Sequence, residues 1–127
     1  MANSRKHITE LHQEINQWRN LVMLAKDEIS IFEKELEEIV SKNTHSDLLR
    51  KVQHFESQFI IQKEASDALL HDLKIADNKM SDMTRNNPAA DRILVDDHTD
   101  LRKKADAFEK IFLALRKEYR EFLSVVF

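Results

Sequence analysis

One short stretch of the chain places a histidine among three aspartates. The sequence V-D-D-H-T-D-L, residues 95–101, carries His98 with Asp96, Asp97 and Asp100 around it. Imidazole and carboxylate groups are ligands of many metal ions and are the usual general acids and bases of enzymes. The same aspartates could instead form the acidic first turn of a helix, where the helix dipole stabilises negative charge. The choice between these readings depends on the elements that carry the residues.

Other motifs for catalysis or metal binding are absent from the sequence. Di-iron carboxylate bundles use Glu-x-x-His motifs, and none of the six histidines has a glutamate three positions before it. The chain has no cysteine and no glycine, which excludes thiolate metal sites, cysteine nucleophiles and glycine-rich phosphate loops. We therefore predict a protein that is not an enzyme, with no catalytic residues, no metal site and no cofactor.

The composition is typical of long helices. The chain has 127 residues, of which 34% are charged, with no glycine and one proline. A β-rich fold would need glycine at its tight turns, whereas the abundant Leu, Glu, Lys and Ala favour helices. Because the length suits one domain, we expect an all-α fold with a single helical-bundle domain over residues 1–127.

Apolar residues recur at alternating intervals of three and four along three segments. This spacing is the a and d pattern of a coiled coil, in which one stripe of each helix packs against its neighbours. We predict helices over about residues 4–42, 45–85 and 88–126, each roughly 60 Å long. The stripe covers residues 48–83 in the second segment and 94–126 in the third. The first segment shows it unbroken, at Ile8, Leu11, Ile15, Trp18, Val22, Ala25, Ile29, Phe32, Leu36 and Ile39.

Two short breaks separate the three segments. In the first, Asn43 can take the left-handed conformation that ends many helices, and Thr44 with Asp47 has the spacing of a capping box. In the second, Asn87 can cap a new helix whose first turn contains Pro88. Short connections make consecutive helices antiparallel neighbours, so we predict an up-down-up bundle with coiled-coil-like packing.

This topology predicts which residues share a level along the rod. If each turn acts as a mirror, residue numbers at one level sum to about 88 for the first two helices and about 175 for the last two. His98 occupies an a position, and the mirror places it near Asp77 and His12. The sharpest chemical hypothesis is a protonation switch or weak metal site formed by His98, His12 and Asp77. The alternative is a half-buried histidine at the end of an apolar seam.

Two further features of the stripes affect how the bundle packs. Gln62 and Ser66 place polar groups in the middle of the second stripe, where a polar residue commonly fixes register at some cost in stability. A ligand pocket around this pair is the alternative. Trp18 shares a level with Ala105, which predicts a large side chain packed against a small one.

Several large apolar residues lie outside the a and d positions. Six of them occupy b or c positions, which face outward, and all fall in the middle-to-upper part of the rod. Contiguous apolar patches of this kind mark interaction surfaces. We therefore predict that the bundle self-associates there, most simply as a homodimer, or docks a partner helix. The surface, which we call the apolar belt, comprises Leu21, Met23, Leu24, Ile31, Ile60, Ile61, Ile111 and Leu113.

Charge is spread evenly along the chain. The net charge is −3, and the basic clusters at residues 102–104 and 116–120 have acidic residues among or beside them. Nucleic acids and anionic membranes favour an unbalanced positive face. No uninterrupted apolar run approaches the ~20 residues needed to span a bilayer. We expect a cytoplasmic protein with a protein partner, and with neither nucleic acid nor membrane as a partner.

Two functions from different classes follow from these observations. The leading hypothesis is a non-enzymatic helical interaction or scaffold module that self-associates through the apolar belt. The alternative is a metal- or small-ligand-binding bundle with a regulatory role, which senses pH or a ligand through the His98 end or through Gln62 and Ser66.

Overall fold

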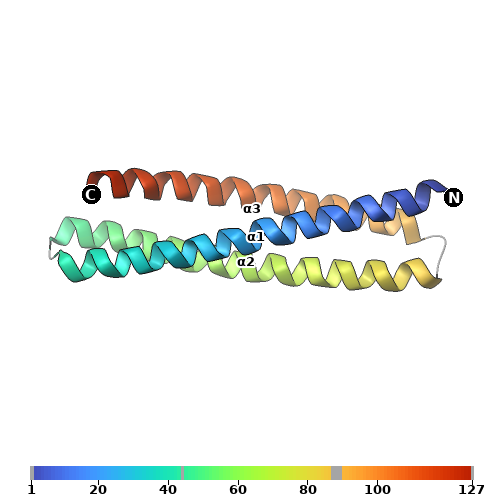
Figure 1. Cartoon of the computed structure of the whole chain (residues 1–127), viewed down its shortest axis with the longest axis horizontal. Coiled ribbons are helices and arrows are strands. Elements are labelled where there is room, and N and C mark those ends of the chain that lie inside the picture. Colours follow the sequence, from blue (N-terminus) through green and yellow to red (C-terminus); the bar gives the residue numbers. More distant parts are fainter. Residues whose placement is uncertain (1, 44, 87–89, 127) are drawn as a thin grey trace.

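The computed structural model of the chain is a rod of three long helices (Figure 1). α1 spans Ala2–Lys42, α2 spans Ser46–Asn86 and α3 spans Ala90–Val126. α1 and α3 run in the same direction along the rod, and α2 runs in the opposite direction (Figure 1). The predicted all-α bundle of three helices is confirmed, with helix bounds close to those expected.

The structure describes most of the chain, apart from a few residues at the turns and at both ends. Backbone is described for residues 2–43, 45–86 and 90–126, and side chains are described for residues 9–43, 45–81 and 97–126. The predicted capping residues Thr44, Asn87 and Pro88 lie outside these ranges.

The end of α1 differs from the prediction. No residue in the described ranges has a positive φ, so Asn43 does not adopt the left-handed conformation expected of it. Its side-chain Nδ2 instead donates a hydrogen bond of 2.9 Å to the carbonyl oxygen of Ile39. The last carbonyls of a helix lack intrahelical partners, and an amide side chain can satisfy one of them. Asn43 therefore caps α1 with its side chain.

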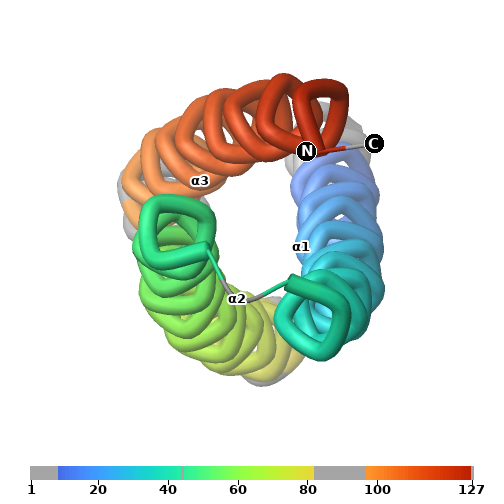
Figure 2. Tube along the Cα trace, turned by 90° about the vertical axis from the view of Figure 1, so that its left-hand side faces the viewer, coloured from blue at the N-terminus to red at the C-terminus, as the bar shows by residue number. Residues whose placement is uncertain are grey.

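The core follows the predicted stripes. Every buried residue among the described side chains occupies a predicted a or d position, including the polar residues Gln62, Ser66 and His98. Seen along the rod, each helix drifts clockwise as it approaches the viewer, which is a left-handed twist (Figure 2). A seven-residue repeat on a helix of 3.6 residues per turn imposes this handedness. Four stripe residues are only partly buried: Trp18, Leu48, Ala76 and Val126.

An aromatic cluster joins all three helices in the half of the rod that contains the α1–α2 turn. The Tyr119 ring lies with its centroid 4.6 Å from that of Phe32 and 5.1 Å from that of Phe59. Phe55 and Phe122 complete the cluster. The Tyr119 hydroxyl donates a hydrogen bond of 3.2 Å to the carbonyl oxygen of Phe32. Buried hydroxyls need such a partner, so this bond ties α3 to α1 at a fixed level.

Ion pairs flank each seam at positions that agree with the helix directions. Most pairs between the antiparallel helices join e to e for α1–α2 and g to g for α2–α3, and most pairs between the parallel helices α1 and α3 join g to e. Flanking charges of this kind set partner choice and orientation in coiled coils. Examples are Glu33 with Lys63 at 2.7 Å, Asp72 with Lys104 at 3.1 Å, and Glu14 with Arg102 at 2.9 Å.

Tyr119 provides a test of the core because it is the one tyrosine in the chain. Burial raises its pKa above the ordinary value of 10.0, and the nearby Glu35 carboxylate raises it further. A pKa that is higher in the folded state gives stability that is complete below pH 10.0 and is lost as the pH rises above it. We expect tyrosinate absorbance in an alkaline titration to appear together with loss of helical circular dichroism. Tyrosinate that forms near pH 10.0 in a fully helical protein would contradict this packing.

Candidate functional site

His98, on α3, is buried in the core of the bundle. Its side chain is 4% exposed, and its ring packs on Trp18 with centroids 4.8 Å apart and planes tilted by 31°. The His98 Nε2 atom lies 3.3 Å from Oε1 of Glu14. Trp18 therefore packs on His98, which lies seven residues before Ala105, the residue predicted to share a level with Trp18. This fits helix geometry, because long side chains lean toward the N-terminus of their own helix.

Glu14 is the carboxylate that faces His98, and Arg102 holds it in place. Arg102 Nη2 donates to both carboxylate oxygens, at 2.9 and 3.1 Å, and Nε donates to Oε2 at 3.3 Å. Burial acts to raise the pKa of Glu14, but the hydrogen bonds and charge of Arg102, together with His98, outweigh it. The pKa of Glu14 therefore lies below its ordinary value of 4.5.

The predicted group of His98, His12 and Asp77 is divided between two pairs. His12 Nδ1 lies 2.8 Å from Asp77 Oδ1 in a partly exposed pair between α1 and α2, whereas His98 faces Glu14. Arg19 also approaches Asp77, with Nη2 3.8 Å from Oδ2. Within the described side chains, no group of three or more His, Asp or Glu residues could hold a metal ion. The level rule thus correctly predicted that His12 and Asp77 lie next to each other.

Sequence reasoning missed Glu14 because it considered only the a and d positions. Glu14 and Glu28 occupy g positions of α1 that lie two heptads apart. Arg102 and Arg116 occupy the matching e positions of α3, with the same separation. Both pairs form in the structure, with Arg116 Nη1 3.5 Å from Glu28 Oε1. The g-to-e match of opposite charges between the first and third helices was the signal that could have identified this site.

The three aspartates of the opening stretch do not surround His98. α3 is continuous from Ala90, so these residues lie inside the helix and do not form its first turn. Asp97 accepts a hydrogen bond of 2.7 Å from Lys79 on α2, and Asp100 is exposed. The Asp96 side chain is outside the described side chains. The acidic stretch therefore supplies contacts between helices and solvent-facing charge.

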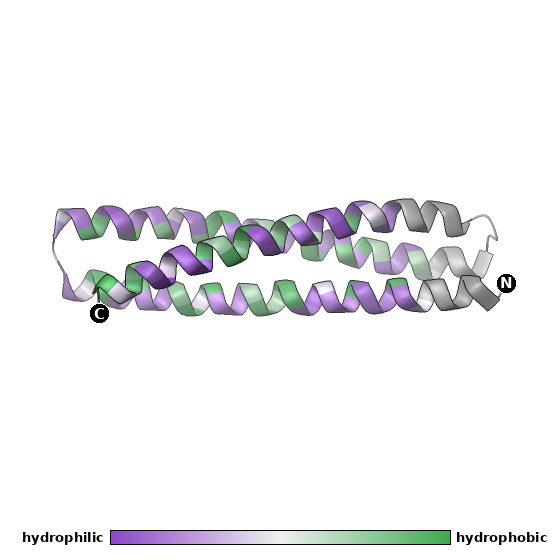
Figure 3. Cartoon of the chain, turned by 90° about the horizontal axis from the view of Figure 1, so that it is seen from above, coloured by the Kyte–Doolittle hydropathy of each residue, from purple (hydrophilic) through white to green (hydrophobic). Residues whose placement is uncertain are grey.

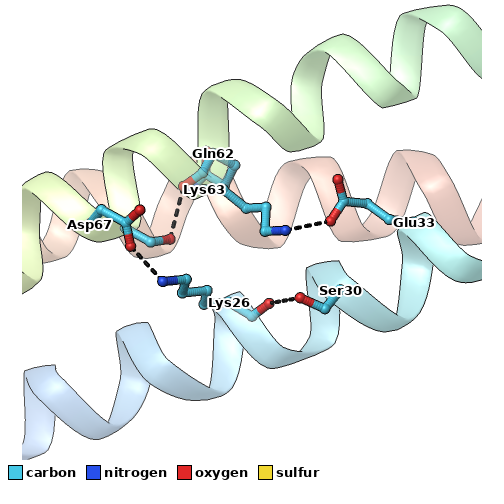
Figure 4. Close-up of polar contacts among 7 residues, drawn as sticks. Lys26, Ser30, Glu33, Gln62, Lys63 and Asp67 are labelled. Atoms are coloured by element: carbon cyan, nitrogen blue, oxygen red, sulfur yellow. Dashed lines mark hydrogen bonds and ion pairs between the residues drawn. The ribbon is translucent and has the colours of Figure 1, made fainter.

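The polar pair in the α2 stripe is buried. Gln62 is 3% exposed and Ser66 is fully buried, and Ser66 Oγ donates 2.8 Å to the Gln62 carbonyl oxygen. Within the described residues, Gln62 Nε2 has no hydrogen-bond partner, which costs about 1–3 kcal/mol for a buried amide group. Two ion pairs between α1 and α2 lie beside this pair (Figure 4). They are Lys63 with Glu33 at 2.7 Å and Lys26 with Asp67 at 2.6 Å.

Seven of the eight residues of the apolar belt are exposed, from 41% for Leu113 to 69% for Leu24. Figure 3 shows hydrophobic segments that recur along all three helices, to which both the core stripes and the apolar belt contribute. Leu21 is half-buried, which departs from the prediction. It occupies the g position between Glu14 and Glu28, on the side of α1 that faces α3.

The apolar belt encircles the rod and is not confined to one face. α2 contacts α1 through its e side and α3 through its g side. Ile60, at b, therefore lies toward α1, whereas Ile61, at c, lies toward α3. By the same geometry Ile111 lies on the α2 side of α3 and Leu113 on its α1 side. Ile61 and Ile111 thus flank the same seam.

A groove of about 320 Å³ runs along this α2–α3 seam. Its floor includes Leu69 and Phe108, and exposed alanines form much of its walls. Small wall residues leave the floor accessible to a side chain from outside. The alanines are Ala65 and Ala68 on α2 and Ala107 on α3.

Comparison of the chain with protein-family models, with curated proteins and with solved structures finds no match. Across the described residues, no helix combines the length and apolar character needed to cross a membrane. The geometry of the sites is therefore the basis for inferring function.

Substitution of Glu14 tests the polar contact beneath His98. Because its pKa is lowered in the folded state, the carboxylate stabilises the fold above its ordinary pKa of 4.5, and this stability is lost as the pH falls through the folded value. We expect Glu14→Gln to lower the free energy of unfolding by about 1 kcal/mol at neutral pH, and by much less in acid. Urea unfolding at neutral and at acidic pH measures the two free energies of unfolding. Glu37→Gln, at an exposed glutamate of the same helix, is the control. An equal loss for Glu14→Gln at both pH values would refute the interaction.

Proposed function

We propose that the protein is a non-enzymatic helical interaction module of the cytoplasm that self-associates, most simply as a homodimer, and serves as a scaffold. One observation carries the proposal: large apolar side chains remain exposed around the middle of the rod. Ile31 is 59% exposed, Ile61 is 56% exposed and Ile111 is 60% exposed. Exposed apolar groups that cluster in this way favour association, because their burial removes apolar surface from water.

The accessible surface of the chain also supports association. It amounts to 8843 Å², against about 7,000 Å² for a compact monomer of this mass. The difference arises from the rod shape, which leaves long helix faces covered only by solvent. A stable interface needs about 800 Å² from each partner, so one face of this rod is large enough.

The polar groups of the core support a packing role. His98 packs between Trp18 and Glu14, and the Tyr119 hydroxyl binds the backbone of Phe32. Each of these contacts joins α1 to α3, which are distant in sequence. The groups best suited to chemistry thus hold the bundle in register.

A pH-sensing bundle is the second candidate, and the His98 environment favours it. Its imidazole is 4% exposed and lies 3.3 Å from a carboxylate, so protonation would change a contact between two helices. Self-association or stability that changes between about pH 5 and 8, and that ceases to change in His98→Gln, would support this function. A metal-binding role would require a stoichiometric bound metal in the purified protein.

Sedimentation velocity over a range of protein concentrations tests self-association. We expect a species of twice the chain mass of 15.0 kDa to replace the monomer as concentration rises. Because burial of apolar surface drives the association, added salt should not dissociate the dimer. A monomer at every concentration would contradict the proposed function.

A further inference from the structure

The seam between α2 and α3 contains a stretch without charge. Between the pair His54–Glu118, at 3.0 Å, and the pair Asp72–Lys104, at 3.1 Å, every residue at the outer c and g positions is uncharged. We call this stretch the α2–α3 window. Depletion of charge at the centre, with charged groups at the rim, is the pattern of protein–protein interfaces. The window consists mainly of Ile61, Ala65, Ala68, Ala107, Ile111 and Ala114.

The window contains both projections and a hollow. Ile61 and Ile111 project from it, and the alanines open the groove of about 320 Å³ down to Phe108. A surface that carries both a knob and a hole can pack against a copy of itself, as the two-fold interfaces of homodimers do. The shape of the window therefore fits a second copy of this chain.

The charges beside the window select one orientation for that copy. The f positions of α3 beside the window are the exposed lysines Lys103, Lys110 and Lys117. The f positions of α2 over the same stretch are Ser57, Glu64 and His71, among which Glu64 is the acidic residue. Packing α3 on α3 of a second copy would align the lysines and repel. A two-fold axis along the rod instead places α3 on α2 of the second copy, and the two helices are then antiparallel.

The register places Glu64 and Lys110 at one level. Asp72 and Lys104 pair across the seam, so they mark a common level on α2 and α3. Glu64 lies about 12 Å from Asp72 along α2, and Lys110 lies about 9 Å from Lys104 along α3, in the same direction along the rod. A rotation about an axis along the rod preserves levels. Glu64 would therefore face Lys110 of the second copy, and the symmetry forms this pair twice.

We propose that a second copy of this chain covers the α2–α3 window, in a two-fold dimer whose axis runs along the rod. The proposal rests on the self-association proposed above and names the surface that forms it. The centre of the interface is Ile111 in the alanine-lined groove of the other copy. Its rim is Glu64 of each copy against Lys110 of the other.

Two matched substitutions test the surface. Ile111→Asp places a charge in the window, and Leu24→Asp makes the same kind of change on α1, at a side chain 69% exposed. Both positions are exposed, so circular dichroism should show full helix content in each variant. We expect Ile111→Asp to weaken the dimer at least about tenfold by sedimentation equilibrium, since central interface residues carry most of the affinity. Leu24→Asp should change it less than about twofold.

Charge reversal tests the orientation. Glu64→Lys alone or Lys110→Glu alone should weaken the dimer severalfold, because each creates two repulsive contacts. The double variant Glu64→Lys with Lys110→Glu should restore the affinity. Loss without rescue would overturn the two-fold arrangement.

The outcomes separate this proposal from the one on which it depends. If the chain self-associates and Leu24→Asp disrupts the dimer while Ile111→Asp does not, the window is wrong and self-association stands. If the unmodified chain is a monomer at every concentration, both proposals fail.

Discussion

The apolar stripe of each helix must be covered by the other two along its whole length. A stripe with a spacing of three and four residues stays on one side of the helix only if the helices twist around one another, which explains the left-handed twist of the rod. Fully burying one large aliphatic or aromatic side chain contributes about 1.5–3 kcal/mol, and each helix buries several. The ion pairs contribute much less, because most are solvent-exposed. They act on register and direction within a bundle that the stripes assemble.

The sequence predicted the buried positions well because burial depends on local spacing. Ile15, Phe59 and Tyr119 could be assigned to the core from their intervals to neighbouring apolar residues. Helix directions followed from the shortness of the turns. The e and g contacts were harder, because they require the side of each helix that faces each neighbour. Glu14 and the half-buried Leu21 were missed or misplaced for that reason.

The choice between local alternatives was also beyond prediction. A helix can end on a left-handed residue or on a side-chain cap, and Asn43 is compatible with both. The chain uses the side chain. The spacing of apolar residues placed His98 at an a position. The level rule, however, did not show whether Asp77 of α2 or Glu14 of α1 is the carboxylate that faces it. That choice depends on whether the facing helix lies on the g or the e side.

An odd number of helices gives the rod a direction. α1 starts and α3 finishes at opposite ends, so groups attached at those two points are held apart by roughly the 60 Å length of a helix. Tension between them would load the long seams in shear, and many contacts would have to yield together. Two copies related by an axis along the rod would point the same way. Such an assembly would be a polar spacer, with two equivalent attachment points at each end.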